Sequence, residues 1–143
     1  MPSQADGKLA PVLIGAPGVT GCLRWDPLST DADYLAAARA ALAHDVPDDV
    51  LTAAMNLLTP DAPAAIYGVA PELTEDRYGA LKRVFIKCSQ DWTIRPGTQD
   101  LMIADLDAAF PDNKMVVHEI DTSHEVMLSK PKELAAVLLR IAG

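Results

Sequence analysis

Two residues that could form an acid–base pair each follow a segment with the composition of a β-strand. Asp91 comes after the β-branched and aromatic run at residues 82–88, and His124 comes after a similar run at residues 114–120. A carboxylate that accepts a hydrogen bond from one imidazole nitrogen fixes the tautomer, so the other nitrogen can take a proton from a serine hydroxyl. The spacing alone fits equally a helix-capping aspartate and a histidine in a turn.

The segments that must position this pair form a strand, helix, strand, helix pattern, which is typical of a parallel sheet with right-handed crossovers. Pro96 is expected to open the first helix, and Ser129 is expected to cap the last one. The last helix carries a predicted buried stripe of Leu134, Val137, Leu138 and Ile141. Ligands bind beyond the carboxyl ends of the strands in such sheets, where Asp91 and His124 are expected to lie.

Residues 1–80 are predicted to be a connecting segment and a helical cap, and residues 81–143 are predicted to contain the sheet. The first 30 positions are rich in glycine and proline and are expected to have little regular structure. The elements expected after them are a helix at 34–44 capped by Thr30 or Asp31, a helix from Pro47 to about Leu58, and a proline-rich loop at 59–73.

The composition narrows the possible functions. The chain has 143 residues, of which 50% are hydrophobic, and this fits a single globular domain. The formal net charge of -8 disfavours binding to nucleic acid or to anionic lipid. The sequence has neither a signal-like start nor a stretch of about 18 uncharged apolar residues, so we expect no membrane span and a cytoplasmic location.

The cysteines and the acidic strand end do not indicate a metal site. Cys22 and Cys88 are spaced neither as a disulfide framework nor as zinc ligands, and Cys88 is expected to be an inert core residue. His118 and Glu119 are adjacent on a predicted strand, so their side chains point to opposite faces. We therefore expect no metal site, and no cofactor is implied.

The second half of the chain carries a specific sequence pattern. The residues concerned are KRVFIKCSQD at 82–91, Pro96, Gln99, Met102, Ile103, HEIDTSH at 118–124, Met127 and SKP at 129–131. From Tyr78 onward this pattern resembles the closing segment of the methyl esterase and hydroxynitrile lyase branch of the α/β-hydrolases. The resemblance implies a partial α/β-hydrolase fold, with a helical cap followed by β-α-β-α of a parallel sheet. It also implies that Asp91 is the acid and His124 the histidine of a catalytic triad, and their order in the chain agrees.

Two departures from the family pattern matter. The lyases have a lysine after the histidine, whereas this chain has Glu125, which favours ester hydrolysis over lyase-like activity. The family nucleophile lies in a G-x-S-x-G turn, and none of the serines lies in one; they are Ser3, Ser29, Ser89, Ser123 and Ser129. The chain is therefore expected to be part of a hydrolase, with Met1 as an internal methionine, and to be inactive alone. A truncated form, a misassigned start, a split product and a genuine short protein all fit this expectation.

Three functions follow from this pattern. The first is a carboxylic ester hydrolase with a Ser-His-Asp mechanism, for which this chain supplies the acid and histidine but not the serine. The alternatives are a non-catalytic binding or interaction protein derived from a truncated hydrolase and, with less support, a hydroxynitrile lyase-like activity. The expected ligand is a small-molecule ester, in a pocket lined by Trp25, Trp92, Met127 and Leu128. The strand at 84–86 would lack its family neighbour on one side. This bare edge predicts a homo-oligomer or a complex with the missing N-terminal half.

Overall fold

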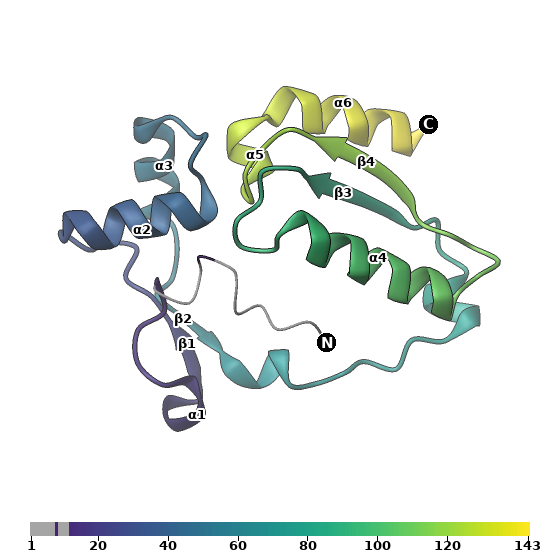
Figure 1. Ribbon diagram of the computed structural model, residues 1–143, viewed down its shortest axis with the longest axis horizontal. Helices are drawn as coiled ribbons and strands as arrows, with labels where there is room; N and C mark the ends of the chain where they lie inside the picture. Colours follow the sequence, from purple (N-terminus) through teal and green to yellow (C-terminus); the bar gives the residue numbers. More distant parts are fainter. Residues whose placement is uncertain (1–7, 9–11) are drawn as a thin grey trace.

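The fold was analysed in a computed structural model that describes residue 8 and residues 12–143. Two groups of elements are visible in Figure 1, one around α2 and α3 and one around β3 and β4. In chain order the elements are α1 (Pro17–Thr20), β1 (Cys22–Arg24), α2 (Ala32–Leu42), α3 (Asp48–Met55), β2 (Asp61–Pro63), the 3-10 helix η3 (Ala64–Tyr67), the π-helical turn η4 (Glu75–Gly79), β3 (Val84–Cys88), α4 (Pro96–Ala109), β4 (Val116–Ile120), α5 (Val126–Ser129) and α6 (Pro131–Ala142).

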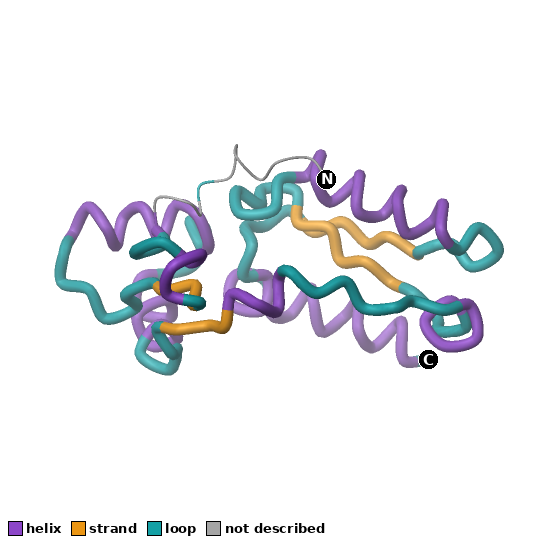
Figure 2. Tube along the Cα trace, turned by 90° about the horizontal axis from the view of Figure 1, so that it is seen from below, coloured by secondary structure: helices purple, strands orange, loops and turns teal. Residues whose placement is uncertain are grey.

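The sheet near the C-terminus is parallel, as the strand, helix, strand, helix pattern predicts. β3 and β4 pair in register from Val84 opposite Val116 to Cys88 opposite Ile120. α4 forms the crossover between them, and α4 and α6 lie on opposite sides of the sheet (Figure 2). Both strands point toward the group that contains α2 and α3 (Figure 1). The residues that directly follow the two strands therefore lie between the two groups of elements.

Most residues of the predicted buried stripe of α6 belong to the core beneath the sheet. Its buried residues are Cys88, Ile120, Val126 and Val137, and Ile86, Leu134 and Ile141 pack against them. Leu138 was predicted to belong to this stripe, but it is 51% exposed. Each residue turns the side chain by about 100° around a helix, so Leu138 faces away while Val137 points into the core.

The start of α6 also differs from the prediction. Ser129 does not cap the helix, because Lys130 holds the N-cap position and no side chain bonds there. Instead, the Ser129 hydroxyl donates to the carbonyl of Glu125, at an oxygen–oxygen distance of 3.3 Å. The short helix α5 ends at Ser129, so this residue serves the end of α5 rather than the start of α6.

The first half of the chain has more regular structure than predicted. β1 and β2 form a small antiparallel pair, with Leu23 opposite Ala62, in segments that were expected to be irregular. An ion pair links the two strands, with Arg24 Nε and Asp61 Oδ1 2.6 Å apart. Strands of three residues are too short to show an alternating pattern, and their partners are far apart in sequence.

Helix α2 is capped by Asp31 as predicted, but it spans Ala32–Leu42 rather than 34–44. The carboxylate of Asp31 accepts hydrogen bonds from the backbone N–H groups of Asp33 and Tyr34, which satisfies two of the free donors of the first turn. Ala38 and Ala41 of this helix form a second core with Val12. α3 begins at Asp48, as expected, but ends at Met55 rather than near Leu58.

Neither a membrane span nor a metal cluster is found in the part of the chain that the structure describes. Every helix of that part is too short or too polar to cross a bilayer. At residue 8 and residues 12–143, no three histidine, cysteine, aspartate or glutamate side chains lie close enough together to hold an ion.

Candidate active site

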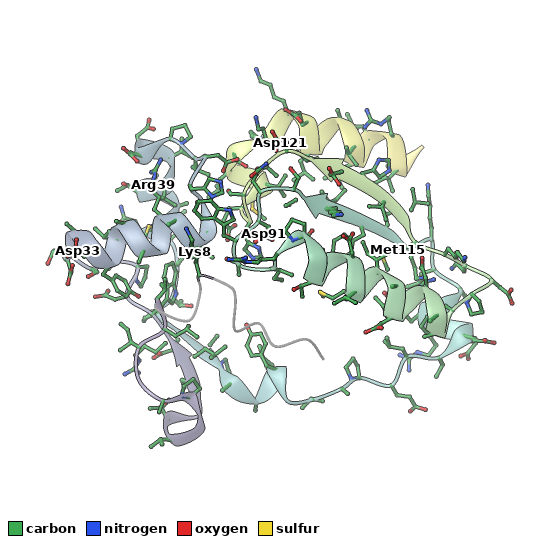
Figure 3. All side chains as sticks on the ribbon, viewed as in Figure 1. Lys8, Asp33, Arg39, Asp91, Met115 and Asp121 are labelled. Carbon is green, nitrogen blue, oxygen red and sulfur yellow. The ribbon has the colours of Figure 1, made fainter. Side chains whose placement is uncertain are left out.

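The ends of β3 and β4 bring Asp91 and His124 into direct contact. His124 Nδ1 lies 2.8 Å from Asp91 Oδ2. Asp91 is 3% exposed, and the side chain of His124 is 29% exposed. Since a carboxylate only accepts hydrogen bonds, Nδ1 carries the proton and Nε2 is left as an acceptor. Figure 3 shows Asp91 at the end of the sheet that faces α2.

The turn after β3 fixes the carboxylate of Asp91 from its other side. Asp91 Oδ1 accepts hydrogen bonds from the backbone N–H groups of Thr93 and Ile94, at 2.8 and 2.9 Å. One oxygen of this buried carboxylate is thus bound by the turn and the other by the imidazole. The side chain has a single orientation in which both oxygens are satisfied.

Gln99, in the first turns of α4, holds the same turn in place. Its side-chain oxygen accepts from the N–H of Cys88, and its side-chain nitrogen donates to the carbonyls of Cys88 and Ile94 at 3.0 and 2.7 Å. It is 3% exposed, so these bonds are shielded from water. The sequence reasoning gave Gln99 no role; a glutamine early in a helix that follows a strand end was the available signal.

A second set of hydrogen bonds ties the loop after β3 to the loop after β4. Asp121 Oδ1 accepts from Ser89 Oγ at 2.7 Å and from Gln90 Nε2 at 3.0 Å. The hydrogen bonds from Ser89 and then from Gln90 lower the pKa of the Asp121 carboxyl below its ordinary value. The two loops that carry the acid and the histidine are therefore linked directly.

The surroundings favour the protonated form of His124. The hydrogen bond to Asp91 raises the pKa of His124 above its ordinary value of 6.5, against the lowering effect of burial. The negative charges of Asp91 and Glu125 act in the same direction as the hydrogen bond. A site that stabilises the imidazolium in this way suits a histidine that takes up a proton during a reaction.

The nearby thiol has the opposite character. Burial, and then the charge of Asp91, raises the pKa of Cys88 to about 11. A thiol with such a pKa is almost entirely protonated at neutral pH, so it is a poor nucleophile.

Three of the four residues predicted to bind substrate line one cavity. Its volume is about 280 Å³ and its walls are mostly apolar. The lining residues are Trp25, Ala38, Arg39, Leu42, Leu51, Ala54, Met55, Leu58, Glu125, Met127 and Leu128. A second hollow of about 180 Å³ borders the acid–histidine pair itself and is lined in part by Phe85, Met102 and His124.

Trp92, the fourth predicted residue, lies outside both hollows. Its ring stacks on the ring of His44, with the centroids 4.4 Å apart. The ammonium group of Lys8 lies 3.5 Å from the centroid of the same ring. The residue next to the acid therefore packs against the end of α2 instead of facing the apolar cavity.

The hydroxyl groups near His124 are already bound to other residues. Ser123 Oγ donates to Asp45, and Ser89 Oγ donates to Asp121. Ser129 Oγ is shared between Thr122 and the carbonyl of Glu125. Ser3 lies outside the described residues. Within the part of the chain that the structure describes, no hydroxyl forms a hydrogen bond with Nε2 of His124.

Comparison with known proteins gives sequence relatives for about half of the chain. No family model matches it. Methylesterase 7 of Arabidopsis thaliana is 44% identical over 69 residues, which are 48% of this chain and 25% of that protein. Methylesterase 3 of the same plant is 39% identical over 70 residues, which are 49% of this chain and 25% of that protein. The match thus covers about a quarter of the length of these relatives.

Solved structures match nearly the whole chain. A pyrethroid hydrolase from Sphingobium faniae JZ-2 has a TM-score of 0.73 at 19% identity, covering 94% of this chain and 48% of that one. Polyneuridine aldehyde esterase has a TM-score of 0.65 at 21% identity, covering 92% of this chain and 47% of that one. These likenesses show the fold, and the chain spans about half the length of either structure.

Proposed function

We propose that this chain, which has part of the α/β-hydrolase fold and a methylesterase-like sequence over about half its length, is the acid-and-histidine part of a carboxylic ester hydrolase. The observation that carries the proposal is the contact between His124 Nδ1 and the buried carboxylate of Asp91 at 2.8 Å. In the proposed Ser-His-Asp mechanism, Asp91 is the acid and His124 is the base. The serine comes from a polypeptide segment outside these 143 residues.

The reaction would proceed through an acyl-enzyme. His124 Nε2 takes the proton of the serine hydroxyl as the serine oxygen attacks the ester carbonyl, and Asp91 stabilises the imidazolium that forms. The imidazolium then gives this proton to the leaving alkoxide, and the alcohol departs. Water attacks the acyl-enzyme with His124 again as the base, which releases the carboxylic acid and restores the serine hydroxyl.

The apolar cavity is the proposed site for one side of a small ester. Trp25, Met127 and Leu128 would contact the acyl or alcohol group, because apolar walls favour a hydrocarbon or aromatic substituent. Glu125, which follows His124 directly, lines the same cavity. A carboxylate at this position gives no cation that could bind cyanide, which is our reason for proposing hydrolysis over lyase-like cleavage.

The proposed partner is a segment that carries the serine. β3 has β4 as its neighbour on one side, and among the described residues no strand pairs with its other edge. An unpaired edge exposes backbone donors and acceptors that a further parallel strand can satisfy. We therefore propose that the active protein contains more strands, either in the same polypeptide or in an associated chain.

Hydrolysis of p-nitrophenyl acetate tests the proposal. The rate is measured for this chain alone and for its mixture with the polypeptide encoded directly upstream. We expect hydrolysis only in the mixture, and we expect His124→Ala to abolish it. His118→Ala is the matched control, because His118 lies on β4 but outside the pair, and its rate should equal that of the wild type.

Two results would contradict the proposal. One is hydrolysis that survives His124→Ala, which would mean that another group is the base. The other is no hydrolysis in any mixture while the chain is folded by circular dichroism. In the second case, binding of an apolar ester without turnover would favour the binding protein instead. It is detected by tryptophan fluorescence in Trp92→Phe, in which Trp25 is the one remaining tryptophan.

A further inference from the structure

The C-terminal end of α2 and the turn after it, residues 41–45, contact both loops of the acid–histidine pair. We call this segment the α2 clamp. It lies between 48 and 83 positions before the residues that it touches, as the spacing from His44 to Trp92 and from Leu42 to Glu125 shows. In Figure 1 the end of α2 lies opposite the carboxyl ends of β3 and β4.

One side of the α2 clamp holds the loop of the acid. The hydroxyl of Thr93 donates a hydrogen bond to the carbonyl of Ala41, at 2.8 Å, and this bond is buried. His44 stacks on Trp92 with an angle of 21° between the rings. Trp92 and Thr93 directly follow Asp91, so these contacts fix the turn that binds its carboxylate.

The other side of the α2 clamp holds the loop of the histidine. Asp45 Oδ2 accepts hydrogen bonds from the N–H of Ser123 and from Thr122 Oγ1, both at 3.1 Å, and Asp45 Oδ1 accepts from Ser123 Oγ. Thr122 and Ser123 are both 0% exposed. On the far side of His124, the N–H of Glu125 donates to the carbonyl of Leu42 at 3.2 Å.

His124 is thus held at the residue before it and at the residue after it by one segment. The last carbonyls of a helix have no partner within the helix, and those of Ala41 and Leu42 find partners in the two loops. Because the same rigid helix end contacts both loops, it limits how far they can move apart. A displacement of about 1 Å at a reacting group can lower a rate about 100-fold.

We propose that Asp45 is a positioning residue, which holds His124 in the orientation that pairs it with Asp91. The inference rests on the role proposed for that pair, and it adds a residue that touches neither the substrate nor the imidazole. Asp45 acts through Ser123 and Thr122, and the carbonyls of the α2 clamp support the same arrangement. The α2 clamp and the two loops of the acid–histidine pair therefore hold one another in place.

Nuclear magnetic resonance of His124 tests this role in the whole chain. The readouts are the pKa of its imidazole and the downfield signal of the proton on Nδ1. We expect Asp45→Asn to lower the pKa of His124 toward 6.5 and to broaden or remove the downfield signal, because the imidazole is less firmly held against Asp91. Loss of a purely structural contact elsewhere would lower stability without moving these signals.

Two further variants separate position from charge. Ser123→Ala removes one hydrogen bond of Asp45 without changing any charge, so it should move both signals in the same direction by a smaller amount. Asp105→Asn makes the same chemical change at an exposed position on α4 and should move neither. Ser123→Ala decides the question alone if Asp45→Asn does not fold.

The proposal is overturned if the pKa of His124 and its Nδ1 proton signal are the same in folded Asp45→Asn and Ser123→Ala as in the wild type. This result does not depend on hydrolysis. If the signals move but the mixture with the upstream polypeptide hydrolyses no ester, then the positioning role stands and the proposed function fails. If ester is hydrolysed but the signals do not move, then the proposed function stands and the positioning role fails.

Discussion

The charge of His124 links the stability of the chain to pH. Its pKa is raised in the folded state, chiefly by the hydrogen bond to Asp91, so folding favours the protonated form. The resulting stabilisation is fully present below the unfolded value of about 6.5 and is lost as the pH rises through the folded pKa. The pair therefore contributes most to stability on the acid side of neutrality.

This loss of stabilisation with rising pH leads to a first prediction. The difference in the free energy of unfolding between the wild type and His124→Gln should be larger at about pH 5.5 than at about pH 9. Urea unfolding followed by circular dichroism measures it at both values, with His118→Gln as the control for loss of a histidine outside the pair. A difference that is equal at both pH values, or larger at the alkaline one, would show that His124 is not stabilised as a cation.

Cys88 gives a second prediction at the scale of the residue. Its pKa of about 11 and its burial predict slow alkylation by iodoacetamide at neutral pH. Cys22 is partly exposed and serves as the comparison within the same molecule. We expect Cys22 to react at least roughly 100-fold faster, measured by mass spectrometry of the peptides. Equal rates would mean that Cys88 is accessible and that the core beneath the sheet opens readily.

At the scale of the elements, the junction of β3 and α4 depends on one side chain. Gln99→Ala would leave the buried N–H of Cys88 and the half-buried carbonyl of Ile94 without their side-chain partner. Such groups each cost about 1–3 kcal/mol, so we expect a loss of about 2–4 kcal/mol in the free energy of unfolding. Urea unfolding tests this third prediction. Asp105→Ala, at an exposed position on α4, should change stability by about 0.5 kcal/mol or less.

If Gln99→Ala and Asp105→Ala were equally stable, then the bonds of Gln99 would contribute nothing beyond what water provides. A smaller loss that is accompanied by an unchanged pKa of His124 would show that the turn keeps its shape without Gln99. The prediction thus concerns both the stability of the junction and the orientation of Asp91.

The elements that local composition determines were predicted from the sequence. The parallel strands and α4 follow from a β-branched run and from a proline that opens a helix, and their order in the chain predicts the crossover. The β1–β2 pair was missed because it depends on Arg24 and Asp61, which are distant in sequence. The role of Gln99 was missed because a side chain that binds backbone groups leaves no periodic pattern.

In the candidate site, too, some contacts could be predicted from the sequence and others could not. The contact between Asp91 and His124 could be predicted, because the carboxyl ends of adjacent parallel strands meet at one edge. The packing of Trp92 against His44 and the bonds of Asp45 to the histidine loop could not, because they depend on how α2 docks against the sheet. Hydrophobic periodicity describes one element at a time and does not give the docking of two.

At the scale of the whole molecule, the likeness in sequence and the likeness in fold cover different shares of the chain. The sequence relatives cover about half of the chain, whereas the solved structures cover more than nine-tenths of it. The predicted fold class, a partial α/β-hydrolase fold, is confirmed by these structures. The likeness in fold thus extends well beyond the segment in which the sequence is similar.

The edge of β3 with which no strand pairs among residues 12–143 gives a fourth prediction. A parallel strand with a free edge and apolar neighbours tends to find another strand, so we expect this chain to associate with itself or with the serine-bearing segment. Sedimentation velocity over a dilution series should show species heavier than the 15.2 kDa of one chain. The upstream polypeptide should replace these self-associated species with a defined complex. A single 15.2 kDa species at every concentration, with and without that polypeptide, would contradict the prediction.

The central claim is that this chain assembles the acid and the histidine of a hydrolase by itself. The most direct test is the titration of His124 by nuclear magnetic resonance, in the wild type and in Asp91→Asn, with His118 as the internal control. The account predicts a pKa above 6.5 in the wild type and a lower one in the variant, with the His118 signal unchanged. A pKa of 6.5 or below that does not respond to Asp91→Asn would contradict it.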